Sequence, residues 1–139
     1  KTQNNLEEKL LPYDQREINS LKNTITGSVY KVTIDNSHPM AFGYPKNYYS
    51  LKKGSESYQL IDQGYNVGYI DGDAISVAGF SGEVAKKGLK NSLVFGEKRL
   101  GKGSIIYMVD DVLFRSFWEN GKLFLANAVF FVNNSKFRL

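Results

Sequence analysis

The sequence predicts a mixed α+β fold of the broad α/β class, with a mixed, partly antiparallel sheet and helices packed on it. The patterns run from one helical segment through several short strands to a long apolar helical segment, without regular strand–helix alternation. Aromatic residues make up 14% of the chain, which favours strands. The glycine-flanked turn at 101–103 is typical of a hairpin, so we expect antiparallel pairs.

Length and charge indicate one globular domain with an ordinary solvated surface. The chain has 139 residues, of which 42% are apolar, and a net charge of +4 spread among acidic residues. This balance predicts no nucleic-acid partner, and no apolar run is long enough for a membrane span. The absence of cysteine excludes disulfides. We divide the chain into a frayed segment, 1–12, and a single domain, 13–139.

The expected elements follow from apolar periodicity and turn residues. Asp14 with Glu17 resembles a capping box and predicts a helix over about 15–23. The aromatic stretch 40–49 contains Gly43 and Pro45 and is expected to be an ordered loop. Short apolar runs predict strands at 29–34, 58–61, 67–70, 75–78, 93–95 and 105–109, and a helical turn or two at 83–88.

The segment 114–132 predicts a long helix that is apolar over much of its circumference. Such a helix must be covered on most sides, so we expect Trp118 and the phenylalanines around it to be buried. Asn127 lies in the middle of this apolar pattern. We expect its amide to be hydrogen-bonded in the core, where it would hold a neighbouring loop in place.

Familiar catalytic and metal motifs fail in this chain. His38 is the single histidine, which with no cysteine argues against a zinc site. Ser81 lacks the second glycine of a nucleophile elbow. A P-loop pattern beginning at Gly96 has glycine, not serine or threonine, at its eighth position. The sequence therefore predicts no catalytic residue, no metal ligand and no cofactor.

Polar residues gather at two predicted strand ends. Asp35 and His38 follow one strand, Asp110 and Asp111 follow another, and Arg115 lies just beyond them. If the two strand ends are neighbours, these five residues form a polar pocket able to bind a ligand. The alternative is that Arg115 pairs with an aspartate and only caps the loop.

Two motifs carry a resemblance to a known family. The run DNSHPMAFG at 35–43 is one of them, and the segments FRSFW at 114–118 and NAVFF at 127–131 form the other. Together they resemble the C-terminal, class I glutamine amidotransferase-like domain of large secreted zinc carboxypeptidases of the carboxypeptidase A-like family from Bacteroidetes-type bacteria. The likeness extends over about 13–132.

The resemblance implies the distal part of a flavodoxin-like amidotransferase-type domain. The chain would then be a non-catalytic accessory domain cut from a longer protein. That protein would be secreted, periplasmic or on the cell surface. The partner would be an upstream peptidase domain, and zinc is expected only there, with none in this chain. The families' catalytic residues do not carry over, because the chain has no cysteine nucleophile and His38 is followed by Pro39, Met40 and Ala41.

An alternative function is a small-molecule or glycan binding module that uses the strand-end pocket, with a peptide or glycan as ligand. Open sheets of this kind usually bind ligands where their strands end. If Trp118 or the paired phenylalanines face solvent, we expect another domain, or a second copy of the chain in a homodimer, to cover them.

Overall fold

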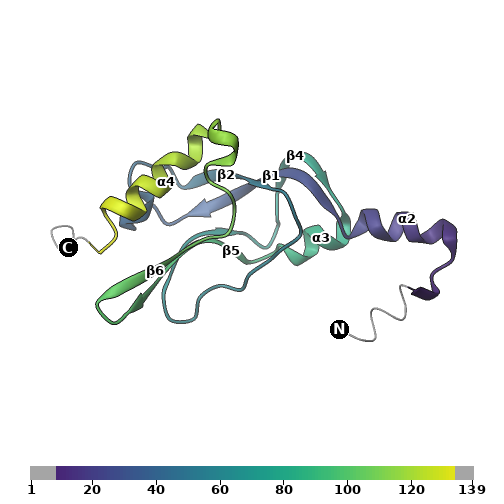
Figure 1. The fold of residues 1–139 in the computed structure, drawn as a ribbon, viewed down its shortest axis with the longest axis horizontal. Coiled ribbons are helices and arrows are strands. Elements are labelled where there is room, and N and C mark those ends of the chain that lie inside the picture. Colours follow the sequence, from purple (N-terminus) through teal and green to yellow (C-terminus); the bar gives the residue numbers. More distant parts are fainter. Residues whose placement is uncertain (1–8, 134–139) are drawn as a thin grey trace.

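The computed structural model describes residues 9–133, which form a mixed α+β fold built on a six-stranded sheet (Figure 1). The strands are β1 (Ile25–Ile34), β2 (Asn47–Lys52), β3 (Tyr65–Ile70), β4 (Ser76–Ser81), β5 (Ser92–Leu100) and β6 (Gly103–Met108). The helices are α2 (Tyr13–Lys22), α3 (Glu83–Gly88) and α4 (Glu119–Phe130), with short 3-10 turns η1 (Pro39–Ala41) and η2 (Phe114–Ser116).

The predicted fold class is confirmed, and the sheet is more regular than expected. Its order is β2-β1-β3-β5-β6, and β4 also pairs with β1. Every strand pair in the described part of the chain is antiparallel, so the parallel pairing of a flavodoxin-like domain is not found there. β1 is central, because β2 pairs along one of its edges while β3 and β4 share the other.

The sheet curls so that the segment leaving β6 returns to β2, at the opposite end of the strand order. Asp110 accepts a hydrogen bond from Ser50 Oγ at 2.5 Å and pairs with Lys52 Nζ at 2.9 Å. Trp118 Nε1 donates to the Tyr48 hydroxyl at 3.1 Å. We call these three contacts the seam. They join the two ends of the curled sheet through side chains.

An aromatic cluster fills the space between the sheet and α4. Phe124 of α4 stacks on Phe95 and on Tyr44, with ring centroids 4.1 and 3.9 Å apart. Tyr48 meets both Phe95 and Phe124 edge to face. Such geometries add to the stabilisation that burial of the rings supplies. Phe124 is therefore the residue that anchors α4 on the sheet.

The prediction of one continuous helix over 114–132 is wrong. Arg115 and Ser116 have φ angles of 49° and 58°, which is left-handed backbone, so η2 ends there and α4 begins afresh at Glu119. Because of this break, the side chains of η2 and α4 do not follow one helical periodicity. The apolar residues of 114–132 therefore do not lie on a single buried face. Phe124 is fully buried, but Phe117 is 61% exposed, Phe130 is 68% exposed and Trp118 is half-buried.

Three smaller predictions are also corrected. The helix α2 starts at Tyr13, its N-cap position is Pro12, and no side chain caps it, so Asp14 lies within the first turn. No strand forms at 58–61, where the backbone is irregular. Part of the expected loop 40–49 belongs instead to β2, which pairs with β1 from Asn47 onward.

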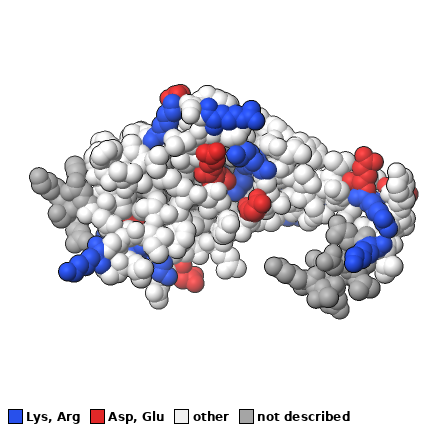
Figure 2. Space-filling model, in the orientation of Figure 1, with Lys and Arg blue, Asp and Glu red and all other residues white. Residues whose placement is uncertain are grey.

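The helix α2 extends away from the sheet (Figure 1), and none of its residues is buried. Within residues 9–133 no helix is both long and apolar enough to cross a membrane. Figure 2 shows basic and acidic side chains interspersed on the visible face, with wide areas that carry neither.

Candidate functional site

The polar residues at the strand ends form two separate groups, and the first surrounds His38. Its Nε2 lies 2.9 Å from Glu97 Oε2, and its Nδ1 accepts a hydrogen bond from the Met40 N–H at 3.2 Å. An accepting Nδ1 carries no proton, so the imidazole is neutral and donates through Nε2. Burial lowers the pKa of His38, although the nearby Glu97 and Asp35 carboxylates oppose this shift.

The Asp35 carboxylate makes its hydrogen bonds within its own turn. Its carboxylate accepts hydrogen bonds from the Ser37 backbone N–H and from the Ser37 hydroxyl, which closes the turn after β1. His38 in turn caps η1 through its bond to Met40. His38 therefore has a structural role, since Nδ1 caps the turn and Nε2 holds the turn against Glu97 of β5.

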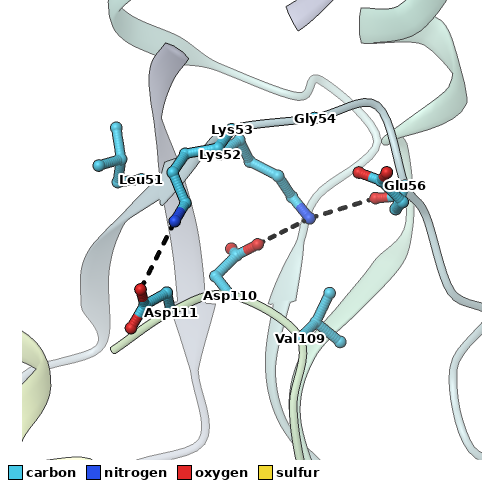
Figure 3. A pocket seen from close by; sticks show the side chains of 8 residues that line it. All are labelled: Leu51, Lys52, Lys53, Gly54, Glu56, Val109, Asp110 and Asp111. Atoms are coloured by element: carbon cyan, nitrogen blue, oxygen red, sulfur yellow. Dashed lines mark hydrogen bonds and ion pairs between the residues drawn. The ribbon is translucent and has the colours of Figure 1, made fainter. Parts of the chain in front are cut away.

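The second group lies in a pocket of about 310 Å³ between the end of β2 and the segment that follows β6 (Figure 3). This volume is at the lower end of the range for sites of small ligands. The pocket is lined by Leu51, Lys52, Lys53, Gly54, Glu56, Val109, Asp110 and Asp111. Figure 3 shows that both lysines reach down from one wall toward the two aspartates of the other.

Lys52 and Asp110 form the buried ion pair of the pocket. Their side chains are 3% and 8% exposed, and Nζ and Oδ1 are 2.9 Å apart. Lys52 Nζ also donates to the Glu56 carbonyl at 3.3 Å, and Asp110 accepts from Ser50. A buried pair is tolerated when further hydrogen bonds satisfy its partners, and here the Glu56 carbonyl and Ser50 supply them. Lys52 and Asp110 thus belong both to the seam and to the pocket.

Lys53 and Asp111 form a looser pair at the mouth of the pocket. Lys53 Nζ lies 3.5 Å from Asp111 Oδ2, and each side chain is about half exposed. Lys53 Nζ also lies 4.5 Å from the centroid of the Phe114 ring, within the range of a cation–π contact. Asp111 Oδ1 accepts from the Leu113 N–H at 3.1 Å, which fixes the carboxylate in place.

The structure thus brings only two of the five predicted site residues, Asp110 and Asp111, into the pocket. Lys52 faces Ser28 in the β1–β2 register, whereas Asp35 follows Ile34 at the far end of the same strand. Asp35 and His38 therefore belong to the other group.

Arg115 lies outside the pocket lining. Its guanidinium lies 5.1 Å from the centroid of the Phe114 ring, on the exposed turn η2. Neither the predicted five-residue cluster nor an aspartate pair of Arg115 is seen among the contacts of residues 9–133.

The two lysines of the pocket are not among the site residues that the sequence predicts. A pair of adjacent lysines resembles an ordinary solvated surface, and 40–49 was expected to be a loop. The available signal was the alternation of Tyr48, Ser50 and Lys52, all of which are buried on one face of β2. A lysine that continues such a series is expected to have a carboxylate partner.

The groups of this pocket are suited to binding through ion pairs and hydrogen bonds. Two ammonium groups and three carboxylates belong to the residues that line this small space, and Ser50 adds a hydroxyl that donates to Asp110. In the part of the chain that the structure describes, no group of three or more His, Cys, Asp and Glu side chains is arranged to hold a metal ion.

Comparison with models of protein families, with curated proteins and with solved structures shows no match to this chain.

Proposed function

We propose that this chain is a binding module whose ligand is a small polar molecule held in the pocket of Lys52, Lys53, Asp110 and Asp111. The observation that carries the proposal is a pocket of about 310 Å³ in which charged groups of both signs face each other, one pair being buried. A few convergent polar groups in a concave site are the usual sign of a ligand site.

Titration of the isotope-labelled chain with a panel of amino acids, monosaccharides and dicarboxylates tests this proposal. The amide resonances of Lys52, Lys53, Gly54 and Asp111 should shift, while those of α3, which contributes no residue to the pocket lining, should not. Leu51→Trp adds bulk to the pocket lining and should abolish the shifts. If no compound of the panel shifts the pocket resonances at millimolar concentration, the proposal is wrong.

We also propose that the module serves as a non-catalytic accessory domain of a secreted zinc carboxypeptidase, with the peptidase domain as partner. The two sequence motifs support this assignment. The exposed apolar side chains of α2, among them Tyr13, Ile18 and Leu21, offer a surface for the partner domain.

Activity and metal content of the purified chain test the accessory role. We expect no peptidase or glutaminase turnover, and less than stoichiometric zinc by elemental analysis. Turnover that survives repurification and follows the chain through a second column would overturn it.

A further inference from the structure

The two ion pairs of the pocket differ in how readily a ligand can open them. The Lys52–Asp110 pair is almost fully buried, and its other hydrogen-bonding groups are already used, so opening it would leave buried charges unpaired. The Lys53–Asp111 pair is half exposed and its atoms are 3.5 Å apart. Pairs of this kind contribute little to stability and open easily.

When the Lys53–Asp111 pair opens, it presents one cation and one anion to the pocket. Lys53 keeps its place over the Phe114 ring, and Asp111 keeps its bond from the Leu113 N–H. The two groups therefore stay positioned while Lys53 Nζ and Asp111 Oδ2 are released from each other. A ligand with both a carboxylate and an ammonium group can satisfy both, whereas a ligand of single charge leaves one of them without its partner.

A further charged side chain, which is exposed to solvent, belongs to the lining. The pocket is lined by two lysines and three acidic residues, which is a formal charge of −1. Glu56 forms no ion pair with any residue of 9–133, and its carboxylate lies beside Gly54 (Figure 3), where a Cβ on the glycine would collide with it. A second cationic group on the ligand would find this carboxylate.

We propose that the ligand is a zwitterion of the α-amino-acid type and that a basic side chain is preferred. This inference rests on the function proposed above and specifies its ligand. The ligand carboxylate binds Lys53, its ammonium group binds Asp111 Oδ2, and the side-chain cation points toward Glu56. The buried Lys52–Asp110 pair forms the floor and remains closed.

Calorimetric and NMR titrations of the chain with blocked and unblocked compounds test the ligand class. Lysine and glycine should bind, and acetate, methylammonium, N-acetylglycine and glycinamide should bind at least about tenfold more weakly, since each lacks one charge-assisted contact. Lys53→Gln and Asp111→Asn should each weaken the binding of free lysine by about tenfold for the same reason. The matched control is Lys87→Gln, which removes the exposed Lys87–Glu83 pair on α3 and should change nothing.

Glu56→Gln tests the preference for a basic ligand. In the unaltered chain lysine should bind about threefold tighter than glycine, as expected for a partly exposed ion pair, and Glu56→Gln should remove that difference without weakening glycine. Glu83→Gln, an exposed acid on α3, is the control.

The outcomes distinguish this inference from the proposed function. If monosaccharides or dicarboxylates shift the pocket resonances while lysine and glycine do not, the zwitterion inference is wrong and the binding module stands. If the singly charged compounds bind as tightly as glycine, the inference is also wrong. If no compound shifts the resonances of the pocket residues, both the binding module and the zwitterion inference are wrong.

Discussion

At the scale of single residues, Asn127 links the C-terminal helix to the turn after β1. Its Nδ2 donates to the Met40 carbonyl at 3.1 Å and to the Phe42 carbonyl at 2.8 Å, and the residue is almost fully buried. The expected role of a core amide that holds a neighbouring loop is confirmed. The side chain replaces two hydrogen bonds that the turn carbonyls would otherwise make with water.

Replacing this amide should be costly. We expect Asn127→Ala to lower the free energy of unfolding by about 2 kcal/mol, because two carbonyls lose their donor in a buried place. Urea denaturation followed by circular dichroism measures the change. Asn120→Ala, on the exposed side of the same helix, should change it by less than about 0.5 kcal/mol. Equal effects of the two changes would contradict the role assigned to Asn127.

His38 makes stability depend on pH. Its pKa in the folded protein is lowered from the ordinary value of 6.5, chiefly by burial. Below pH 6.5 the unfolded chain takes up a proton on this imidazole that the folded protein does not. The stabilisation is therefore complete above pH 6.5 and is lost as the pH falls toward and through the lower folded-state pKa. Glu97, Asp35 and Arg99 are the charged groups around the ring.

Denaturation midpoints measured between pH 7.5 and 5 test this dependence. The free energy of unfolding should fall with a slope of at most about 1.4 kcal/mol per pH unit, the value for one proton. His38→Gln should reduce the slope even though it lowers stability at every pH, since the chain has a single histidine. A variant with the same slope as the unaltered chain would show that other groups cause it.

At the scale of elements, the first turn of α4 packs directly on backbone. A Cβ placed on Gly121 would collide with the Val112 carbonyl oxygen and lie 2.8 Å from its carbon. Backbone atoms cannot move aside as a flexible side chain can. The glycine therefore permits the close approach of α4 to the segment that crosses from β6.

Adding one methyl group at Gly121 should separate these segments. We expect Gly121→Ala to lower the free energy of unfolding by about 1–3 kcal/mol, the usual effect of overpacking. Gly88→Ala, at the end of α3 where nothing lies within 4 Å of the added carbon, should be neutral or slightly stabilising. Thermal melting of both variants measures the contrast, and a harmless Gly121→Ala would mean that α4 is not packed this closely.

Much of the element order could be predicted, because alternation and turn residues are local signals. β1, β3, β4, β5 and β6 each overlap a predicted strand. β2 was missed because Gly43 and Pro45 precede it and made the whole aromatic stretch look like a loop. The break at Arg115 was missed because left-handed backbone in a residue other than glycine leaves no mark in the apolar pattern.

The site was less predictable, since it depends on contacts between distant segments. Asp110 and Asp111 could be identified as polar residues after a strand. Their partners, Lys52 and Lys53, could not be assigned without the curl of the sheet, which brings β2 to the segment after β6. For the same reason the sequence could not show that His38 and Asp110 belong to different groups.

At the scale of the whole molecule, stability is distributed unevenly. The core residues lie mainly in the sheet, with others in the turn after β1, in and around α3, in the segment after β6 and in α4, whereas α2 contributes none. Isolated helices of this length are marginal in water. We expect the amides of α2 to exchange with deuterium far faster than those of β1 and β5, as hydrogen-exchange mass spectrometry would show. Strong, concentration-dependent protection of α2 would instead point to a homodimer that covers it.

The seam also bears on how fast the chain folds. Ser50 and Asp110 are 60 residues apart in sequence, and Tyr48 and Trp118 are 70 apart. Contacts across such long loops cost chain entropy before they stabilise anything, so they form late on the way to the native state. Weakening them should leave the folding rate almost unchanged and speed unfolding instead. We therefore expect the pocket, whose floor is part of the seam, to be completed late in folding, and a ligand of the proposed kind should lengthen the lifetime of the folded state.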